Sequence, residues 1–189
     1  MAQQPNSSAC SSLYLVDGHS QLYKAFYGVR GLSTSSGLPT NAVFGFVQTL
    51  HRLIEVRQPD YLGIVFDTPT PSFRNEIYPA YKAHRPAQPE DLSVQIPWVK
   101  RIVEEMNLAV IEMPGYEADD VIATLAERAN AQGLDVWIVS TDKDLMQLVE
   151  QRIRMLRMEP DSEVVIDASE VRRRMGVGPQ QITDLLGLM

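Results

Sequence analysis

The sequence has little of what would cross-link a protein or anchor it in a membrane. Its 189 residues include one cysteine, Cys10, so no internal disulfide can form and a reducing, cytoplasmic setting is expected. The chain has no run of eighteen apolar residues, which argues against a membrane-spanning helix and a membrane partner. The first twelve residues are polar and lack the apolar segment of a signal peptide, so we expect a loose tail over 1–12.

The sequence lacks the motifs of several enzyme classes that act on phosphates or use a nucleophilic side chain. The chain has no Gly-x-x-x-x-Gly-Lys-Ser/Thr loop, which disfavours a P-loop nucleotide hydrolase. No Gly-x-Gly-x-x-Gly follows the first predicted strand, which disfavours a dinucleotide-binding domain. A phosphatase of the haloacid dehalogenase type would place a second Asp two positions after Asp17, where this chain has His19. Thiol catalysis has no Cys–His pairing to support it.

The composition is that of a globular protein with a concentrated negative charge. The chain is 44% hydrophobic and 22% charged, enough for one core in one domain or slightly more. The net charge of −7 comes from 24 acids and 17 Lys plus Arg, which by itself argues against a nucleic-acid partner. Setting aside seven acids that we assign below to one pocket leaves 17 acids against 17 bases. A nearly neutral surface with one acidic pocket is therefore compatible with nucleic acid.

Apolar runs and helical periodicities alternate along most of the chain. Strands are predicted at 13–16, 61–66, 109–112, 135–140, 153–158 and 163–166, and helices at 19–28, 42–56, 94–106, 117–131, 144–149, 167–175 and 179–188. Strands that alternate with helices pair in parallel through right-handed crossovers. The sequence therefore predicts an α/β sandwich.

Carboxylates follow four of these strands at the point where each strand ends. They are Asp17, then Asp67, then Glu117, Asp119 and Asp120, and finally Asp142 and Asp144. A single Asp at the end of a strand is more often a helix cap than a metal ligand, by about three to one. For the crowded turn at Glu117, helix capping and a metal site have about even odds. Four acidic strand ends meeting at one sheet edge favour a metal site instead. Oxygen ligands without His or Cys suit Mg²⁺ or Mn²⁺, and two such ions support phosphodiester hydrolysis.

A proline-rich segment at 68–97 interrupts the alternation. It holds six prolines, which predicts a projecting, partly irregular segment. Composition alone favours a solvated loop over a nucleic-acid contact by about two to one. The acidic pocket nearby shifts the interpretation towards a nucleic-acid contact. The candidates for that contact are Tyr81, Lys82 and Arg85 in the segment, Arg74 as a further phosphate contact, and Tyr23 and Lys24 near Asp17, although Tyr23 also suits the core.

Four ordered motifs match a known family. LVDGHSQLYKAFY, GIVFDTPTPSFRNEIYPAYKAHRP, PGYEADDVIATLA and VSTDKDLMQLV together resemble the 5′-nuclease (5′-3′ exonuclease) domain of bacterial DNA polymerase I, a relative of flap endonucleases. The resemblance implies a PIN-like three-layer sandwich with a mostly parallel central sheet and a projecting helical arch. It implies a core over 13–178, the arch over about 68–97, and the start of a helix–hairpin–helix DNA-binding region at 179–189.

The resemblance also implies an activity and a role for individual residues. The seven acids would bind two divalent ions, Lys82 would contact the scissile phosphate, and Arg85 would help to stabilise it. The implied reaction is metal-dependent cleavage of DNA 5′ flaps, 5′ single-stranded ends and RNA primers in replication and repair, giving 5′-phosphate products. A polymerase domain is the expected partner in the parent chain.

One departure from the family leaves other functions open. The family continues after a segment like ITDLLGLM with Gly-Asp-x-x-Asp-Asn, whose two Asp residues complete the second metal site, whereas this sequence stops at Met189. We therefore expect an intact fold with weak or absent turnover. A catalytically inactive module that binds flaps or single strands is one alternative. A PIN-type ribonuclease, which would not need the basic and aromatic arch, is another.

Overall fold

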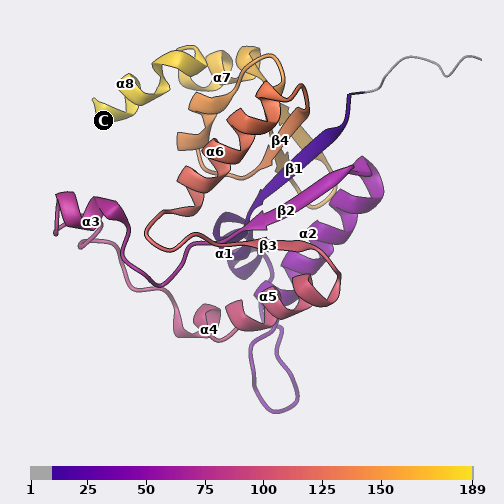
Figure 1. Cartoon of the computed structure of the whole chain (residues 1–189). Coiled ribbons are helices and arrows are strands. Elements are labelled where there is room, and N and C mark those ends of the chain that lie inside the picture. Colours follow the sequence, from indigo (N-terminus) through magenta and orange to yellow (C-terminus); the bar gives the residue numbers. More distant parts are fainter. Residues whose placement is uncertain (1–9, 189) are drawn as a thin grey trace, which may run out of the picture.

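A six-stranded sheet forms the middle layer of the protein (Figure 1). The structure is a computed structural model, which describes residues 10–188. The strand order is β3-β2-β1-β4-β5-β6, and every neighbouring pair is parallel except β5 and β6. The strands are β1 (Ser12–Asp17), β2 (Tyr61–Val65), β3 (Ala109–Ile111), β4 (Asp135–Val139), β5 (Ile153–Met158) and β6 (Glu163–Ile166).

Helices cover both faces of the sheet and complete the three predicted layers. On one face α1, α2 and α5 pack on Tyr14, Val16 and Ile64, and on the other α6 packs on Leu15 and Val65. The helices are α1 (Gly18–Gly28), α2 (Asn41–Arg57), α3 (Phe73–Ile77), α4 (Glu90–Ser93), α5 (Ile96–Glu105), α6 (Ala118–Ala131), α7 (Ala168–Met175) and α8 (Ile182–Gly187), with short 3₁₀ turns η1 (Asp144–Leu148) and η2 (Pro179–Gln181). None of these helices between residues 10 and 188 is long and apolar enough to cross a membrane.

Successive residues of the central strand serve the two cores in turn. Tyr14 and Leu15 are 3% and 1% exposed and belong to different hydrophobic clusters. Side chains of a strand alternate between the two faces, so a strand covered by helices on both faces must be apolar throughout. This explains why LYLV reads as a continuous apolar run, and it confirms the predicted α/β class.

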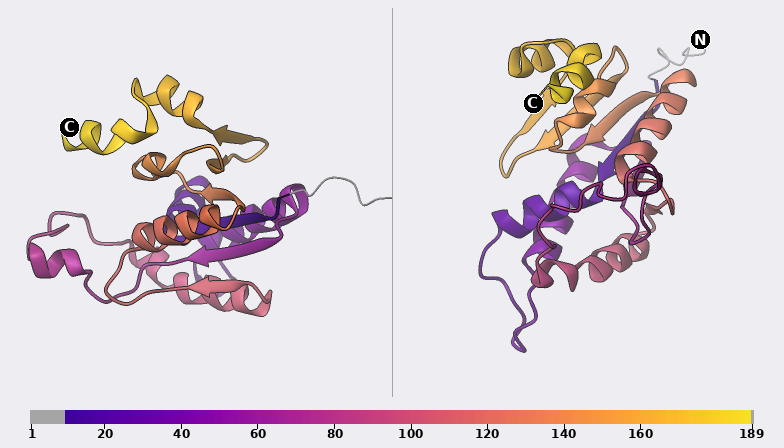
Figure 2. Two further views of the ribbon diagram at one scale, coloured as in Figure 1. Left: turned by 45° about the horizontal axis from the view of Figure 1, so that its top comes forward. Right: turned by 90° about the vertical axis from the view of Figure 1, so that its left-hand side faces the viewer.

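The predicted arch projects from the sheet, but it ends earlier than 97. The helix α3 lies away from the core, beyond the carboxyl ends of the strands and on the same side as α8 (Figures 1 and 2). By contrast, Leu92 and Gln95 are fully buried. The Gln95 amide oxygen accepts the backbone N–H groups of Ala42 and Val43 at 2.9 and 3.2 Å. Gln95 thus caps α2, and this contact fixes the last part of the segment in the core.

The start of β1 differs slightly from the predicted boundary of the tail. The predicted tail covers 1–12, of which 1–9 lie outside the described residues. Ser12 is already in β1, and both its backbone N–H and its hydroxyl donate to Asp60 Oδ2, at 2.7 and 2.9 Å. The strand therefore begins one residue before the predicted apolar run, because Asp60 gives a polar residue a partner there.

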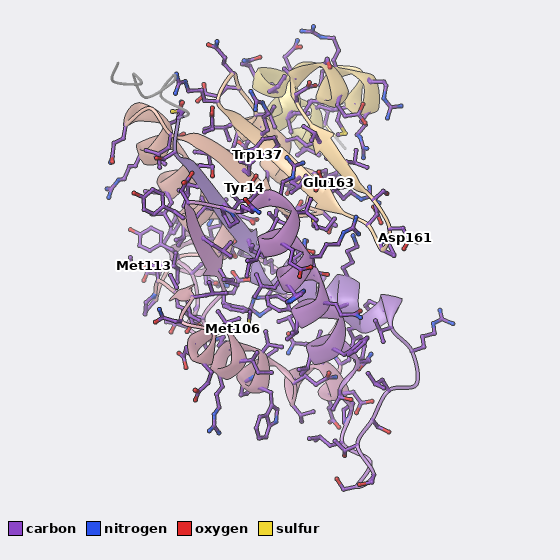
Figure 3. The ribbon with its side chains drawn as sticks, turned by 90° about the vertical axis from the view of Figure 1, so that its right-hand side faces the viewer. Tyr14, Met106, Met113, Trp137, Asp161 and Glu163 are labelled. Atoms are coloured by element: carbon purple, nitrogen blue, oxygen red, sulfur yellow. The ribbon has the colours of Figure 1, made fainter. Side chains whose placement is uncertain are left out.

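At the end of α2, one arginine ties this helix to the sheet. Tyr14 and Trp137 stack with their ring centroids 5.9 Å apart, and Glu163 lies beside them (Figure 3). The Arg57 guanidinium lies 4.8 Å from the Trp137 ring centroid and 2.5 Å from Glu163. These contacts hold the antiparallel edge of the sheet against α2, far from the carboxylates described below.

Gly18 is required where β1 passes into α1. A Cβ atom at Gly18 would lie 2.4 Å from the Phe66 ring, which is itself 1% exposed. We therefore expect Gly18→Ala to lower the free energy of unfolding by about 1–3 kcal/mol, the usual cost of overpacking a core. Urea unfolding followed by circular dichroism measures this. Gly28→Ala in the same helix is the matched control, because a Cβ there meets nothing within 4 Å and should be nearly neutral.

Candidate metal centre and nucleic-acid cleft

All seven carboxylates predicted from the sequence line one cleft. The cleft has a volume of about 980 Å³ and lies at the carboxyl ends of the strands. Its acidic residues are Asp17, Asp67, Glu117, Asp119, Asp120, Asp142 and Asp144, and Tyr23, Lys24, Arg74, Tyr81, Lys82 and Arg85 line it too. We call this the carboxylate cleft. A second, mainly apolar hollow between α1, α2 and the β5–β6 turn is larger but contains none of the seven carboxylates.

Asp17 is the most enclosed of the seven carboxylates. It ends β1, is 5% exposed, and accepts the backbone N–H of Ser20 at 3.0 Å as the N-cap of α1. Its other oxygen accepts the Ser140 hydroxyl at 2.7 Å. Burial raises the pKa of Asp17 to about 6, although both hydrogen bonds act against this shift. An enclosed carboxylate of this kind is costly to keep ionised without a cation.

Asp67 connects the end of β2 to the start of α6. Its Oδ1 accepts the backbone N–H of Ala118 at 2.8 Å. Its own backbone N–H donates to His19 Nδ1 at 3.2 Å, and the same imidazole nitrogen lies 3.3 Å from Asp67 Oδ2. Burial lowers the pKa of His19, although the charge of Asp67 acts against this, and the lowered pKa favours the neutral imidazole, whose nitrogen can accept this bond. His19 therefore helps to hold Asp67 in place.

Asp119 lies at the electrostatic centre of the cluster. Its pKa is raised to about 7, mainly by burial and then by the charges of Asp17, Asp142 and Asp67, in that order, while Lys82 acts in the opposite direction. Asp119 is thus influenced by carboxylates from three other strand ends. Like charges brought this close repel one another unless a cation shares them.

Asp120 has local partners for both of its carboxylate oxygens. The Arg74 guanidinium binds them in a bidentate pair at 2.6 and 2.8 Å. Asp120 Oδ2 also accepts the backbone N–H of Glu117 at 3.1 Å, which closes the first turn of α6. The Arg74 hydrogen bond is the main reason that the pKa of Asp120 is lowered. Arg74 was predicted as a phosphate contact, and here its fork joins α3 to α6.

Asp142 lies in the loop after β4, and Asp144 begins the 3₁₀ turn η1 that follows. The backbone N–H of Asp142 donates to the Ser140 hydroxyl at 3.0 Å. The backbone N–H of Asp144 donates in turn to Asp142 Oδ1 at 2.9 Å. Burial raises the pKa of Asp144, and the charge of Asp142 raises it further, while Lys143, Arg85 and Lys82 lower it.

The arch brings its basic and aromatic side chains to the acidic cluster. The Lys82 ammonium lies 2.7 Å from Glu117 Oε1, and the Tyr81 hydroxyl donates to Glu117 Oε2 at 3.2 Å. Lys82 has a φ of 59°, a left-handed conformation that is uncommon for a residue with a side chain. Such a conformation persists only where its surroundings enforce it. The ion pair with Glu117 is one such constraint.

The remaining predicted contacts lie on the α1 side of the cleft. Tyr23 stacks on Tyr27 with ring centroids 6.4 Å apart, and burial raises the Tyr23 pKa, while the charge of Arg85 lowers it. The charges of Arg85 and Lys82 both lower the pKa of Asp144, and Lys82 in addition pairs with Glu117. Lys24 lines the cleft, but its ammonium lies 3.5 Å from Glu159 in the β5–β6 turn.

The donor set fits a hard divalent cation better than any other ligand class. The carboxylates supply oxygen only, and Asp17 and Asp119 have pKa values raised mainly by burial and, to a smaller extent, by the charges of neighbouring carboxylates. Among residues 10–188, however, no three His, Cys, Asp or Glu side chains are arranged so that they could hold an ion as they stand. Lys82 and Arg74 pair with Glu117 and Asp120, so side chains would have to turn before either of these carboxylates bound an ion.

Sequence reasoning missed two polar residues that hold the carboxylates. Ser140 is fully buried at the end of β4, and His19 follows Asp17 by two positions. Both lie two residues from a predicted ligand in the sequence, and side chains that hydrogen-bond to ligands are a regular part of metal sites. That proximity was the available signal, but it does not say which of the neighbouring polar residues makes the contact.

Comparison with protein families gives one match over most of the chain. The family model described as "5'-3' exonuclease, N-terminal resolvase-like domain" matches residues 12–176. A 5'-3' exonuclease of Aquifex aeolicus is 45% identical over 178 residues, which are 94% of this chain and 61% of that protein. The thermostable DNA polymerase I of Thermus thermophilus is 40% identical over 188 residues, all of this chain and 22% of the polymerase. The chain thus spans about three fifths of the exonuclease and about a fifth of the polymerase.

Solved structures with low sequence identity share the fold. The flap endonuclease of bacteriophage T5, in a complex with DNA and metal ions, has a TM-score of 0.69 at 20% identity, covering 90% of this chain and 63% of that one. The catalytic core of Rad2 with DNA substrate has a TM-score of 0.56 at 17% identity, covering 91% of this chain and 52% of that one. The three-layer arrangement around a mostly parallel sheet is therefore common to all three.

Proposed function

This chain belongs to the family of 5′-3′ exonuclease N-terminal resolvase-like domains, and on that premise we propose that it is the metal-binding part of a 5′ nuclease. The substrate would be DNA with a 5′ flap or a 5′ single-stranded end, or an RNA primer, met in the cytoplasm. One observation carries the proposal: seven carboxylates and the basic arch residues line the same cleft. Carboxylates alone suit metal binding, and the added Lys and Arg supply the charge that a phosphodiester requires.

In the proposed site, the acids divide into two groups around Asp119. Asp17, Asp67, Glu117 and Asp119 would hold one Mg²⁺ or Mn²⁺, and Asp142 and Asp144 would contribute to a second, with Asp120 as a further candidate. When bound, such ions lower the pKa of a water molecule and neutralise the charge that develops on the leaving oxygen. Burial and the charges of Asp17, Asp142 and Asp67 raise the pKa of Asp119 to about 7, and a bound cation would relieve this cost.

The arch residues would act on the phosphate and on the unpaired bases. The Lys82 ammonium lies 2.7 Å from Glu117 Oε1, so it would bind a phosphate on the Glu117 side of the cluster. Arg85 would act on the side of Asp144 and Tyr23. The Tyr81 ring is 5.1 Å from the Lys82 ammonium and offers a face on which a base can stack. We also propose a polymerase domain as the partner of this module in a longer chain.

The proposal is tested by cleavage of a labelled 5′-flap DNA with Mg²⁺ or Mn²⁺. We expect 5′-phosphate products, formed at the weak rate expected from the sequence, and Asp142→Ala should lower that rate at least a further hundredfold, since it removes a proposed ligand. Asp135→Ala, at the start of β4 and outside the carboxylate cleft, is the control and should keep the wild-type rate.

Two outcomes of this assay would count against the proposal. Binding of flap DNA without any cleavage, at all metal concentrations, would indicate an inactive binding module. Cleavage of plain single-stranded RNA that is faster than cleavage of the flap would indicate a ribonuclease instead.

A further inference from the structure

We infer that Ser140 is a positioning residue. Its hydroxyl holds Asp17 in a fixed position relative to the loop that carries Asp142. This inference rests on the proposed function, and it assigns a role to a residue that is not itself a ligand. Ser140 is fully buried, so its hydroxyl has no access to bulk water and must bond within the protein. Its two partners are the Asp17 carboxylate, at 2.7 Å, and the backbone N–H of Asp142, at 3.0 Å.

The direction of these two bonds fixes the hydroxyl. A serine hydroxyl has one hydrogen, and the Asp142 N–H can only donate, so the Ser140 hydrogen must go to Asp17 Oδ2. The second Asp17 oxygen is held by the Ser20 backbone N–H at 3.0 Å. Each carboxylate oxygen then keeps further lone pairs, so Asp17 is fixed in orientation and can still bind a cation.

The same hydroxyl also holds the loop that carries the second group of acids. The N–H of Asp142 points at Ser140, and the N–H of Asp144 points at Asp142 Oδ1, 2.9 Å away. β1 and β4 are neighbouring parallel strands in which Val16 pairs with Val139, so Asp17 and Ser140 directly follow a paired position. One side chain therefore links the acid at the end of β1 to the two acids after β4.

An ordinary turn contact would explain only half of this arrangement. A serine that accepts the N–H two residues ahead is a common local turn. The Asp17 bond is different, because it spans 123 residues of sequence and reaches a proposed metal ligand. In metal sites, removing a hydrogen bond that orients a ligand weakens metal affinity by about 10–100-fold.

The test is Mn²⁺ affinity, measured by isothermal titration calorimetry on the metal-free protein without DNA. We expect Ser140→Ala to weaken Mn²⁺ binding by about 10–100-fold. Ser140→Thr keeps the hydroxyl and should restore affinity to within about threefold of the wild type. Ser20→Ala removes a hydroxyl bonded to Thr141 in the same loop but keeps the N–H on Asp17, so its effect should be much smaller.

Each result separates this inference from the proposed function. If Ser140→Ala lowers the melting temperature but leaves the Mn²⁺ affinity unchanged, Ser140 is only structural and the inference is overturned. If wild-type protein neither binds Mn²⁺ nor cuts flap DNA, the proposed function fails and takes the inference with it. Should Ser140→Ala fail to fold, Ser140→Cys has a similar size and a weaker donor, and we expect it to give an intermediate affinity.

Discussion

Replacing Lys82 by alanine is expected to slow cleavage of 5′-flap DNA about a hundredfold and, at the same time, to strengthen Mn²⁺ binding. The loss of rate follows from removing a positive charge placed to act on the phosphate, which typically costs 10²–10³-fold. The gain in metal affinity follows from the ion pair with Glu117, whose atoms are 2.7 Å apart. An ion must displace this lysine before it can use that Glu117 oxygen.

The size of the gain follows from the exposure of the pair. The Lys82 side chain is 31% exposed and the Glu117 side chain 17%, so the pair is partly screened by water. Such a pair contributes at most about 1 kcal/mol, which corresponds to about fivefold in affinity. Calorimetric titration with Mn²⁺ measures the affinity, and single-turnover flap cleavage measures the rate.

Lys100→Ala is the matched control for both measurements. Lys100 forms a comparable pair with Glu112, at 2.6 Å, outside the carboxylate cleft. Its replacement should change neither the cleavage rate nor the Mn²⁺ affinity by more than about twofold, since neither partner is a proposed ligand. Full cleavage by Lys82→Ala would show that the arch lysine does not act on the phosphate.

Replacing Asp119 by asparagine is expected to abolish cleavage and to stabilise the metal-free protein at pH 8. The pKa of Asp119 is raised from its ordinary value of 3.8 to about 7 in the folded chain. Between these two values the folded state binds more protons than the unfolded state, so stability falls as the pH rises. Above pH 7 the full cost of the buried charge is present, and below about pH 4 it is absent.

The asparagine removes this cost together with the charge. Allowing for solvent screening, we expect a gain of about 1–2 kcal/mol at pH 8, or about 3–6 °C in melting temperature. At pH 4 the two proteins should melt at nearly the same temperature. Added Mg²⁺ should raise the melting temperature of the wild type more than that of the variant. Only the wild type has the Asp119 carboxylate to bind the ion, and an ion that binds the folded state stabilises it.

Asp161→Asn serves as the control for the charge itself. Asp161 lies at the exposed turn between β5 and β6, away from the cleft (Figure 3). Its replacement removes one negative charge from the chain but should leave the melting temperature unchanged at both pH values. A stabilisation by Asp161→Asn equal to that by Asp119→Asn would mean that net charge, and not the cluster, sets the effect.

Much of the fold could be predicted because the strands are buried on both faces. The last three residues of YLGIV are buried, and residues covered by helices on both sides must be apolar, which makes the strand visible in the sequence. The prolines of 68–97 predicted a projecting segment, and the family resemblance implied that it forms an arch, but neither indicated that its last part is buried. Gln95 is polar, and the sequence gives no sign that it is fully buried as the cap of a helix 53 residues away.

The gathering of the acids was also predictable, whereas their pairing was not. Parallel strands bring their carboxyl ends to one edge, so acids at four strand ends must meet there. Which base pairs with which acid depends on how the arch lies over the cluster. Arg74 was predicted as a phosphate contact and pairs with Asp120, and Lys24 pairs with Glu159 in a turn that is distant in sequence.

The sequence by itself determined the architecture, the seven carboxylates and the edge at which they meet. Periodicity and strand ends are local properties, and the topology of a parallel sheet converts them into a place in space. The Glu117 turn illustrates what only the tertiary structure decided. Asp120 has become the partner of Arg74 and caps the helix, while Asp119 lies among three other carboxylates. Capping and a candidate metal site thus coexist in one turn, because adjacent residues of a helix point in different directions.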